Sequence, residues 1–292
     1  MLAKGTRLFA GAAVVAGMAL VGPSTPSGAV FARPLPVEAV KDIVPERVMT
    51  WNICNPCEDD NVGRAAEIAS YAPQVIGLQE ACVRDVDRLR EYLEKLHGLV
   101  YHVEYGTVLR NWGRCGGWPW RPGAFGQAIL SAAPMTDRVN VEYPEGGSED
   151  RGYMAVTTEV GGRPVRVFNT HLAQRSQEAF REGQTRVLAA EVARHDRAIV
   201  LGDFNAVPEA PELARMWRLS TATDRPCRPA SAGTGTSAET DADADTGTCE
   251  PTTDWQSRFD YVFLRGLTPR EEGVRPSPYS DHHLVHTDID PA

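Results

Sequence analysis

Several stretches of β-forming residues in this sequence end in a polar side chain. The clearest is the aliphatic run 199–201, which leads directly into Gly202-Asp203-Phe204-Asn205. On extended backbone the side chains at i and i+2 point the same way, so Asp203 and Asn205 are predicted to converge on one small target. Oxygen ligands that converge at a strand end suit a divalent cation, a phosphate or a water molecule. Taken alone, the tetrapeptide fits an ordinary Asx-type turn as well.

The same arrangement recurs at other predicted strand ends. In layered sheet proteins ligand sites gather at one edge of the strands, so these positions together predict a single cleft. Glu80 and Asp281 are hard oxygen donors of the kind that hold Mg²⁺ or Mn²⁺. Two histidines, rather than three or more, argue against a hydrolase that relies on zinc alone. The strand-end residues are Asn52, Glu80, His171, Asp203, Asn205, Asp260 and the run Ser280-Asp281-His282-His283.

The elements that position these residues alternate between strands and helices, with hairpins. Gly161-Gly162 between two β-forming runs is a strong signal for a two-residue hairpin. Helices are predicted over 61–71, 83–97, 174–195 and 208–217. Strands are predicted over 48–53, 74–80, 100–108, 124–131, 152–160, 163–169, 199–201, 259–264 and 284–289.

The N-terminus has the pattern of a secretory signal peptide over residues 1–32. A basic opening with Lys4 and Arg7 precedes an apolar run over 8–21, which is too short to span a bilayer, and small-residue cleavage sites follow. No later segment is long and apolar enough to span. We therefore expect a secreted, extracellular protein with a Pro-rich lead-in over 33–46 and no integral membrane segment after cleavage. A monomer is expected.

Charge gives weaker guidance about the substrate. Cleavage removes two basic residues and no acid, so the net charge goes from −9 to −11. Such a charge does not favour a polyanionic substrate, although a metal and a few arginines in a cleft can dominate locally. The acidic, low-complexity stretch 228–256 is predicted to be a solvated loop. Alternating Asp241, Asp243 and Asp245 make a weak Ca²⁺ site an alternative there, without the Gly and terminal Glu of an EF-hand.

Six cysteines are an even set in an exported chain, which predicts disulfides. Cys227 and Cys249 bracket the low-complexity stretch and are predicted to pair. Cys54, Cys57, Cys82 and Cys115 then form two bridges by any of three connectivities. A redox pair or half a zinc site is the alternative for Cys54 and Cys57, but no second such pair completes a zinc set.

An ordered set of six motifs resembles the endonuclease/exonuclease/phosphatase superfamily over almost all of the mature chain. The resemblance implies an α+β fold over 47–292, built as a four-layer α/β/β/α sandwich of two packed mixed sheets with outer helices. It also implies metal-dependent phosphoester hydrolysis. The motifs are Trp51-Asn52-Ile53, Leu78-Gln79-Glu80, Asn169-Thr170-His171-Leu172, Gly202-Asp203-Phe204-Asn205, Phe259-Asp260-Tyr261-Val262 and Ser280-Asp281-His282.

The resemblance implies a role for each strand-end residue. Glu80, with Asn52 and Asp281, would hold Mg²⁺ or Mn²⁺ against a phosphate oxygen. Asp203 would orient or deprotonate the attacking water, while Asn205 would donate to a phosphate oxygen.

The remaining roles concern the histidines and one arginine. His282 would contact the phosphate with Asp260 as its orienting carboxylate, which favours the imidazolium. His171 would bond a phosphate oxygen or the leaving group, and Arg151 resembles the phosphate-binding arginine. Two positions keep a plainer alternative: Asn52 as a turn residue, and Arg151 as one arginine among many.

The substrate is expected to be nucleic acid, and the alternative is a phospholipid or a small phosphodiester or phosphomonoester. A nuclease needs basic and aromatic groups to meet a phosphate backbone and its bases. A tryptophan-rich loop suits that task, suits a lipid interface as in a sphingomyelinase, and equally suits a structural loop with its tryptophans tucked inward. A non-catalytic binding module is disfavoured, because all of the expected carboxylates and both histidines are present. The loop residues are Arg110, Trp112, Arg114, Trp118, Trp120 and Arg121.

Overall fold

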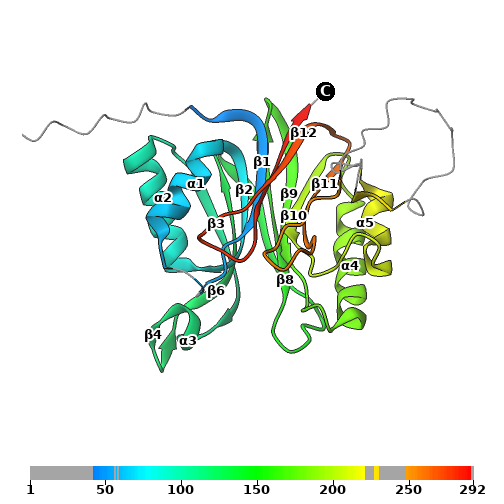
Figure 1. Cartoon of the computed structure of the whole chain (residues 1–292), viewed down its shortest axis with the longest axis horizontal. Coiled ribbons are helices and arrows are strands. Elements are labelled where there is room, and N and C mark those ends of the chain that lie inside the picture. The colour runs from blue at the N-terminus through cyan, green and yellow to red at the C-terminus, as the bar shows by residue number, and fades with distance from the viewer. Residues whose placement is uncertain (1–41, 56, 58, 221–226, 230–247, 291–292) are drawn as a thin grey trace, which may run out of the picture. The chain divides into compact units, whose positions relative to one another are not determined.

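The computed structural model describes residues 42–55, 57, 59–220, 227–229 and 248–290, all within one compact unit that spans 38–292. Two mixed sheets pack face to face in this unit, and helices cover both outer faces (Figure 1). This arrangement confirms the predicted four-layer α/β/β/α fold class. The predicted signal peptide, most of the Pro-rich lead-in and the aspartates proposed for Ca²⁺ lie outside the described residues.

The first sheet has six strands in the order β12-β13-β1-β2-β6-β3. Strands β1 and β2 are parallel, and every other neighbouring pair is antiparallel. The sheet is therefore mixed, and its only parallel pair supplies Asn52 and Glu80. Its strands are β1 (Val44–Asn52), β2 (Pro73–Cys82), β3 (His102–Arg110), β6 (Ala124–Ser131), β12 (Thr268–Arg275) and β13 (Leu284–Asp290).

The second sheet has five strands in the order β11-β10-β9-β8-β7. Strands β9 and β10 are parallel, whereas the other pairs are antiparallel. A separate small ribbon pairs β4 (Gly117–Trp118) with β5 (Arg121–Pro122). The strands of the second sheet are β7 (Met135–Glu142), β8 (Gly152–Val160), β9 (Arg163–His171), β10 (Ala198–Asp203) and β11 (Asp260–Arg265).

Helices α1 (Asn61–Tyr71) and α2 (Val83–His97) pack on the six-stranded sheet, and their apolar faces share a buried cluster with it. The five-stranded sheet shares a second cluster with α4 (Glu178–Val192), the 3-10 turn η1 (Pro211–Leu213) and α5 (Ala214–Leu219). Both helices of the first pair end in a left-handed residue, Ala72 and Gly98, whose N–H caps the last turn. The remaining helix of the described residues is α3 (Trp112–Cys115).

Alternation along each strand divides the core into three layers. In β10, Val200 packs toward the helices, whereas Ile199 and Leu201 pack between the sheets. The two sheets approach closely at Gly77, where a Cβ would stand 2.8 Å from Cβ of Leu201. Burial of apolar side chains on both faces of the central strands therefore fixes which way most of their residues point, including polar ones at the strand ends.

The sequence-based elements agree with the structure over most of the chain, and they differ at the edges of the sheets, at the ends of some helices and in the loop that holds α3, β4 and β5. The predicted helices 61–71 and 83–97 and the hairpin around Gly161-Gly162 are found with nearly the same bounds. The helix predicted over 174–195 is shorter, because α4 spans Glu178–Val192. The edge strands β7 and β12 were not predicted, since both are polar and largely exposed. Charged residues on edge strands discourage pairing with other chains, and they also remove the hydrophobic pattern.

All six cysteines pair in the structure. The predicted Cys227–Cys249 bridge is confirmed, and the other two bridges join Cys54 to Cys57 and Cys82 to Cys115. The Cys82–Cys115 bridge fastens the tryptophan-rich loop to the end of β2. In the described part of the chain, every helix is too short or too polar to cross a membrane.

Candidate active site

Three neighbouring strands of the five-stranded sheet end in polar residues at the same level. Asp203 of β10 is the register partner of both His171 of β9 and Asp260 of β11. Each continues a row of residues that faces the other sheet: Asp203, for example, follows Ile199 and Leu201 at alternate positions. Strand register therefore brings the three side chains together, as the sequence predicted.

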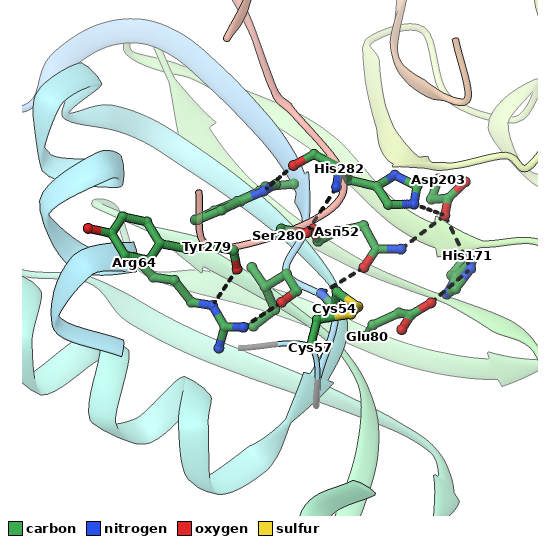
Figure 2. Close-up of a disulfide and its surroundings, with 12 residues drawn as sticks. Asn52, Cys54, Cys57, Arg64, Glu80, His171, Asp203, Tyr279, Ser280 and His282 are labelled. Atoms are coloured by element: carbon green, nitrogen blue, oxygen red, sulfur yellow. Dashed lines mark hydrogen bonds and ion pairs between the residues drawn. A yellow bond between two sulfur atoms is a disulfide. The ribbon is translucent and has the colours of Figure 1, made fainter. Parts of the chain in front are cut away.

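Asn52 carries the same row across to the six-stranded sheet. It follows Val48 at alternate positions in β1, so its side chain faces the space between the sheets. Its Nδ2 donates to Oδ2 of Asp203 at 3.0 Å, and its Oδ1 accepts from the N–H of Cys54 at 2.9 Å (Figure 2). Asn52 therefore bridges the two sheets at the site, beyond tying a local turn.

Glu80 reaches the site through an irregularity in β2. Ile76 and Leu78 face the helices, and strict alternation would send Glu80 the same way. The pairing register shifts between Leu78 and Ala81, and Glu80 adopts a positive φ of 50°. A bulge of this kind re-aims a side chain, here toward His171, whose Nε2 lies 3.9 Å from Oε1 of Glu80 (Figure 2).

His282 forms a buried pair with Asp260. Its Nδ1 lies 2.8 Å from Oδ2 of Asp260, which also accepts a hydrogen bond from Oγ1 of Thr252 at 2.7 Å. Its Nε2 lies 3.8 Å from Oδ2 of Asp203. Burial alone would lower the pKa of His282, but the carboxylates of Asp260 and Asp203 raise it to about 10. His282 is consequently an imidazolium at neutral pH.

His171 has the opposite electrostatic setting. Burial, followed by the positive charge of Arg151, lowers its pKa well below the usual range. Its Nδ1 lies 2.8 Å from Nη1 of Arg151, and its Nε2 lies 3.0 Å from Nδ2 of Asn205 and 3.3 Å from Oδ2 of Asp203. The site therefore contains one neutral and one charged histidine, on either side of Asp203.

Asp203 lies at the centre of these contacts. It is 1% exposed, and its Oδ1 accepts from the N–H of Asn205 at 2.8 Å. Burial raises its pKa to about 7, with Asp260 adding to the rise and His282 opposing it. A carboxylate with a pKa near neutrality is suited to accept a proton from water.

The oxygen donors predicted to hold a cation fit a hard divalent ion. Glu80 is partly accessible, with 26% of its side chain exposed, and burial raises its pKa, which a nearby cation would reverse. Oδ1 of Asp281 is buried and has no hydrogen-bond partner among the described residues. Ser280, its neighbour, donates to the carbonyl oxygen of Asn52 at 2.7 Å. Carboxylate and carboxamide oxygens are the ligands that Mg²⁺ and Mn²⁺ prefer.

A second group of potential metal ligands is better suited to proton transfer than to metal binding. Ligand atoms of Asp203, Asp260 and His282 lie within 4.8 Å of one another, and all three residues are buried. However, a protonated histidine has no free lone pair for a metal. The oxygen donors Glu80, Asn52 and Asp281 are therefore the candidate ligands for a hard cation.

The tryptophan-rich loop meets the site through a shared carboxylate. Glu149 forms ion pairs with both Arg114 of α3 and Arg151. The tryptophans of the loop are exposed, by 64% for Trp118 and 79% for Trp120, and their rings stack at 5.3 Å. The alternative with inward-packed tryptophans is therefore wrong. Trp112, which is 57% exposed, and the exposed Arg121 complete the surface.

Several supporting residues were not singled out from the sequence. Thr252 holds Asp260, and Glu149 joins the two arginines, although neither lies in a recognisable motif. Beneath the site, Nε2 of Gln79 donates to Oδ1 of Asn169 at 2.7 Å and so links the sheets. Gln79 and Asn169 belong to the quoted motifs, and their place in the inward-facing rows was the available signal.

The chain is similar in fold to several solved structures over most of its length. The catalytic domain of human nocturnin with bound sulfate is 23% identical with a TM-score of 0.61, covering 84% of this chain and 94% of that one. An endonuclease/exonuclease/phosphatase from Beutenbergia cavernae is 23% identical with a TM-score of 0.60, covering 83% and 70%. TDP2 of D. rerio in complex with single strand DNA product is 18% identical with a TM-score of 0.58, covering 84% and 98%.

At the level of sequence, no curated protein matches the chain significantly. The profile of the Endonuclease/Exonuclease/phosphatase family matches residues 49–282, which include all of the strand-end residues except His283. The chain belongs to the endonuclease/exonuclease/phosphatase family, whose members are metal-dependent phosphoesterases.

Proposed function

We propose that the protein is a secreted, Mg²⁺- or Mn²⁺-dependent phosphodiesterase that cleaves DNA or RNA. The observation that carries the proposal is the buried contact of Asp203 with Asn52 and its position between His171 and His282. This arrangement brings together a proton acceptor (Asp203), a cationic donor (His282) and an oxygen ligand (Asn52) where the two sheets meet. A binding module has no need of histidines held in opposite charge states.

In the proposed mechanism, Glu80, Asn52 and Asp281 would hold the divalent cation, which would supply charge stabilisation at a phosphate oxygen when bound. Asp203 accepts a proton from the attacking water, for which its raised pKa is suited. Asn52 and the N–H of Asn205 fix the orientation of this carboxylate.

The charged and neutral histidines have different tasks toward the phosphate. His282 donates from Nε2 to a phosphate oxygen while Asp260 holds its Nδ1. His171, held neutral by burial and by Arg151, orients the amide of Asn205 and contacts the leaving-group side. Arg151 adds positive charge, and its buried Nε has no hydrogen-bond partner among the described residues.

The loop around α3 and the β4–β5 ribbon favours nucleic acid. Stacked, exposed Trp118 and Trp120 offer flat apolar faces of the kind on which bases stack. Arg114 connects this surface to Arg151 through Glu149, so a strand lying on the tryptophans meets positive charge as it enters the site. One structural relative is seen with a single strand DNA product.

A phospholipid is the second candidate substrate. Exposed tryptophans at the tip of a short ribbon also suit a membrane interface, where indole rings settle at the level of the headgroups. A sphingomyelinase-like enzyme would use the same catalytic residues and differ only in what this loop contacts.

Secretion is supported by two independent observations. The N-terminal sequence has the pattern of a signal peptide. All six cysteines are paired, which is typical of proteins that mature in an oxidising compartment.

The test presents plasmid DNA, RNA, sphingomyelin liposomes and bis-p-nitrophenyl phosphate to the secreted protein, with Mg²⁺ and with chelator. We expect chelator-sensitive cleavage of nucleic acid and of the small diester. Cleavage of liposomes without cleavage of nucleic acid would replace the nuclease by the lipid hydrolase. Activity that survives the chelator on any substrate would contradict the proposed mechanism.

A further inference from the structure

The Cys54–Cys57 disulfide lies directly against the oxygen donors of the site (Figure 2). Cys54 follows Asn52 by two residues, and its N–H bonds to the Asn52 side chain. The next N–H, of Asn55, donates to the carbonyl oxygen of Glu80 at 3.0 Å. The two sulfurs and a carboxylate oxygen of Asp281 lie within 4.8 Å of one another. The disulfide segment therefore bonds to the side chain of Asn52 and the backbone of Glu80, and its sulfurs lie close to the carboxylate of Asp281.

Cys54 and Cys57 have the spacing of a metal-binding pair. A Cys-x-x-Cys segment in a turn presents two sulfurs to one ion, and here the N–H of Cys57 closes the turn onto the carbonyl oxygen of Cys54 at 2.6 Å. Two thiolates that each lie about 2.3 Å from Zn²⁺ are about 3.8 Å apart in a tetrahedral site. This separation is shorter than the 4.8 Å within which the two sulfurs and the Asp281 oxygen lie. Asp281 is the third member of the group, and its Oδ1 is buried without a hydrogen-bond partner among the described residues.

We propose that reduction of Cys54–Cys57 creates a site for a thiophilic divalent cation such as Zn²⁺, with Cys54, Cys57 and Asp281 as its ligands. In this state Asp281 is withdrawn from the oxygen-ligand set, so Zn²⁺ inhibits hydrolysis. The site itself stands on the geometry alone, whereas the inhibition rests on the proposed function. The intact disulfide keeps Asp281 available to the hard cation.

The chemistry balances with a dithiol as the reductant. The dithiol gives two electrons and two protons to the disulfide, whose S–S bond breaks as the reductant closes its own disulfide. Zn²⁺ then displaces the two thiol protons and binds both sulfurs. Thiolates prefer Zn²⁺ over Mg²⁺, so the reduced pair selects against the ion that the oxygen donors favour.

The structure also indicates which bridges a dithiol reaches. Cys57 is exposed, whereas Cys82 and Cys115 are both buried, at 0% and 3% exposure. The other accessible bridge is Cys227–Cys249, because Cys249 is exposed. The double variant Cys227→Ser/Cys249→Ser therefore isolates the Cys54–Cys57 bridge as the accessible one.

The experiment titrates oxidised and dithiothreitol-reduced protein with Zn²⁺ against a chromogenic chelator, after removal of the reductant without oxygen. The reduced protein is expected to take up one more equivalent than the oxidised protein. The same gain is expected for Cys227→Ser/Cys249→Ser, and none for Cys54→Ser/Cys57→Ser. Asp281→Asn should weaken the binding by about tenfold or more. No gain on reduction, or an equal gain in Cys54→Ser/Cys57→Ser, overturns the site.

Two further readouts keep the test decisive. Co²⁺ replaces Zn²⁺ in the reduced wild type and should show a thiolate charge-transfer absorption that the oxidised protein lacks, so the answer does not depend on any variant folding. With Mg²⁺ and bis-p-nitrophenyl phosphate, one equivalent of Zn²⁺ should slow the reduced protein at least tenfold and leave Cys54→Ser/Cys57→Ser unchanged. Zn²⁺ bound with an unchanged rate overturns the inhibition, whereas an inactive oxidised protein contradicts the proposed function instead.

Discussion

The amide of Asn52, at the end of β1, donates to Oδ2 of Asp203, at the end of β10, over 3.0 Å. These residues belong to different sheets, and their bond closes the site across the junction between them. It also constrains Asp203 from the side opposite to its bond with the N–H of Asn205. The carboxylate is thereby held in one orientation before a substrate binds, which is the preorganisation that catalysis requires.

Asp203→Asn should reduce turnover by about 10²–10⁴, the usual contribution of a positioned general base. The variant should also change the pH dependence of stability. Because the folded-state pKa of Asp203 is raised to about 7, its contribution to stability is full below the unfolded pKa and is lost as pH rises through 7.

The free energy of unfolding, measured in chelator by denaturant titration, should therefore fall in the wild type relative to Asp203→Asn between pH 4 and pH 8. The difference should be at most about 4 kcal/mol. Parallel stability curves for the two proteins over this range would show that the carboxylate is not buried as described.

Asp260→Asn should move the alkaline limb of the pH–rate profile. The pKa of His282 is about 10 because Asp260 and Asp203 outweigh the effect of burial. Wild-type kcat/KM should thus rise as Asp203 ionises near pH 7 and fall as His282 loses its proton near pH 10. Without the Asp260 carboxylate the alkaline limb should move down by about 2 units or more. An unchanged limb would remove His282 from the mechanism.

Glu80→Gln should raise the Mg²⁺ concentration needed for half-maximal rate by about tenfold or more, because a neutral amide is a weaker ligand than a carboxylate. Binding of Mn²⁺, followed by electron paramagnetic resonance, provides a readout that needs no substrate. The matched control is Glu94→Gln, which removes a surface carboxylate paired with Arg90 on α2. Equal Mn²⁺ affinities for the two variants would exclude Glu80 as a ligand.

The double variant Trp118→Ala/Trp120→Ala should weaken the binding of single-stranded oligonucleotides, because stacking on an aromatic ring contributes about 1–3 kcal/mol of binding free energy per base. This corresponds to a rise in KM of about fivefold to 150-fold per stacked base, with little change for bis-p-nitrophenyl phosphate. Phe180→Ala on α4 serves as the control, because it removes a partly exposed ring from the far side of the five-stranded sheet. If both substrates lose rate equally, the loop supports the site structurally and does not bind the strand.

Residue types and alternation were enough to predict much of this site. Asp203, Asp260 and His171 end strands whose apolar residues alternate strongly, so the sequence fixes which way they face. Glu80 was identified as a donor by its residue type and motif, but the bulge that turns it inward leaves no signature in the sequence.

Other features depend on contacts that no local pattern encodes. Glu149 joins Arg114 to Arg151 across 35 and two residues of chain, and nothing in its own neighbourhood announces the pair. Edge strands β7 and β12 were not predicted from the sequence. Each pairs with a neighbour on one side only and is largely exposed to solvent, which favours polar residues over an alternating hydrophobic pattern. Prediction therefore succeeded where burial imposes a regular hydrophobic pattern on the sequence. It failed where a residue's position depends on contacts with distant parts of the chain.

The most direct test of the central claim is the rate of bis-p-nitrophenyl phosphate hydrolysis by wild type and His282→Gln, each with Mg²⁺ and with chelator. The account predicts that the wild type is active only with the metal and that His282→Gln loses about 10²–10³ of the rate, as expected for a lost donor to the developing charge. Hydrolysis that continues in chelator, or that His282→Gln retains in full, would contradict it.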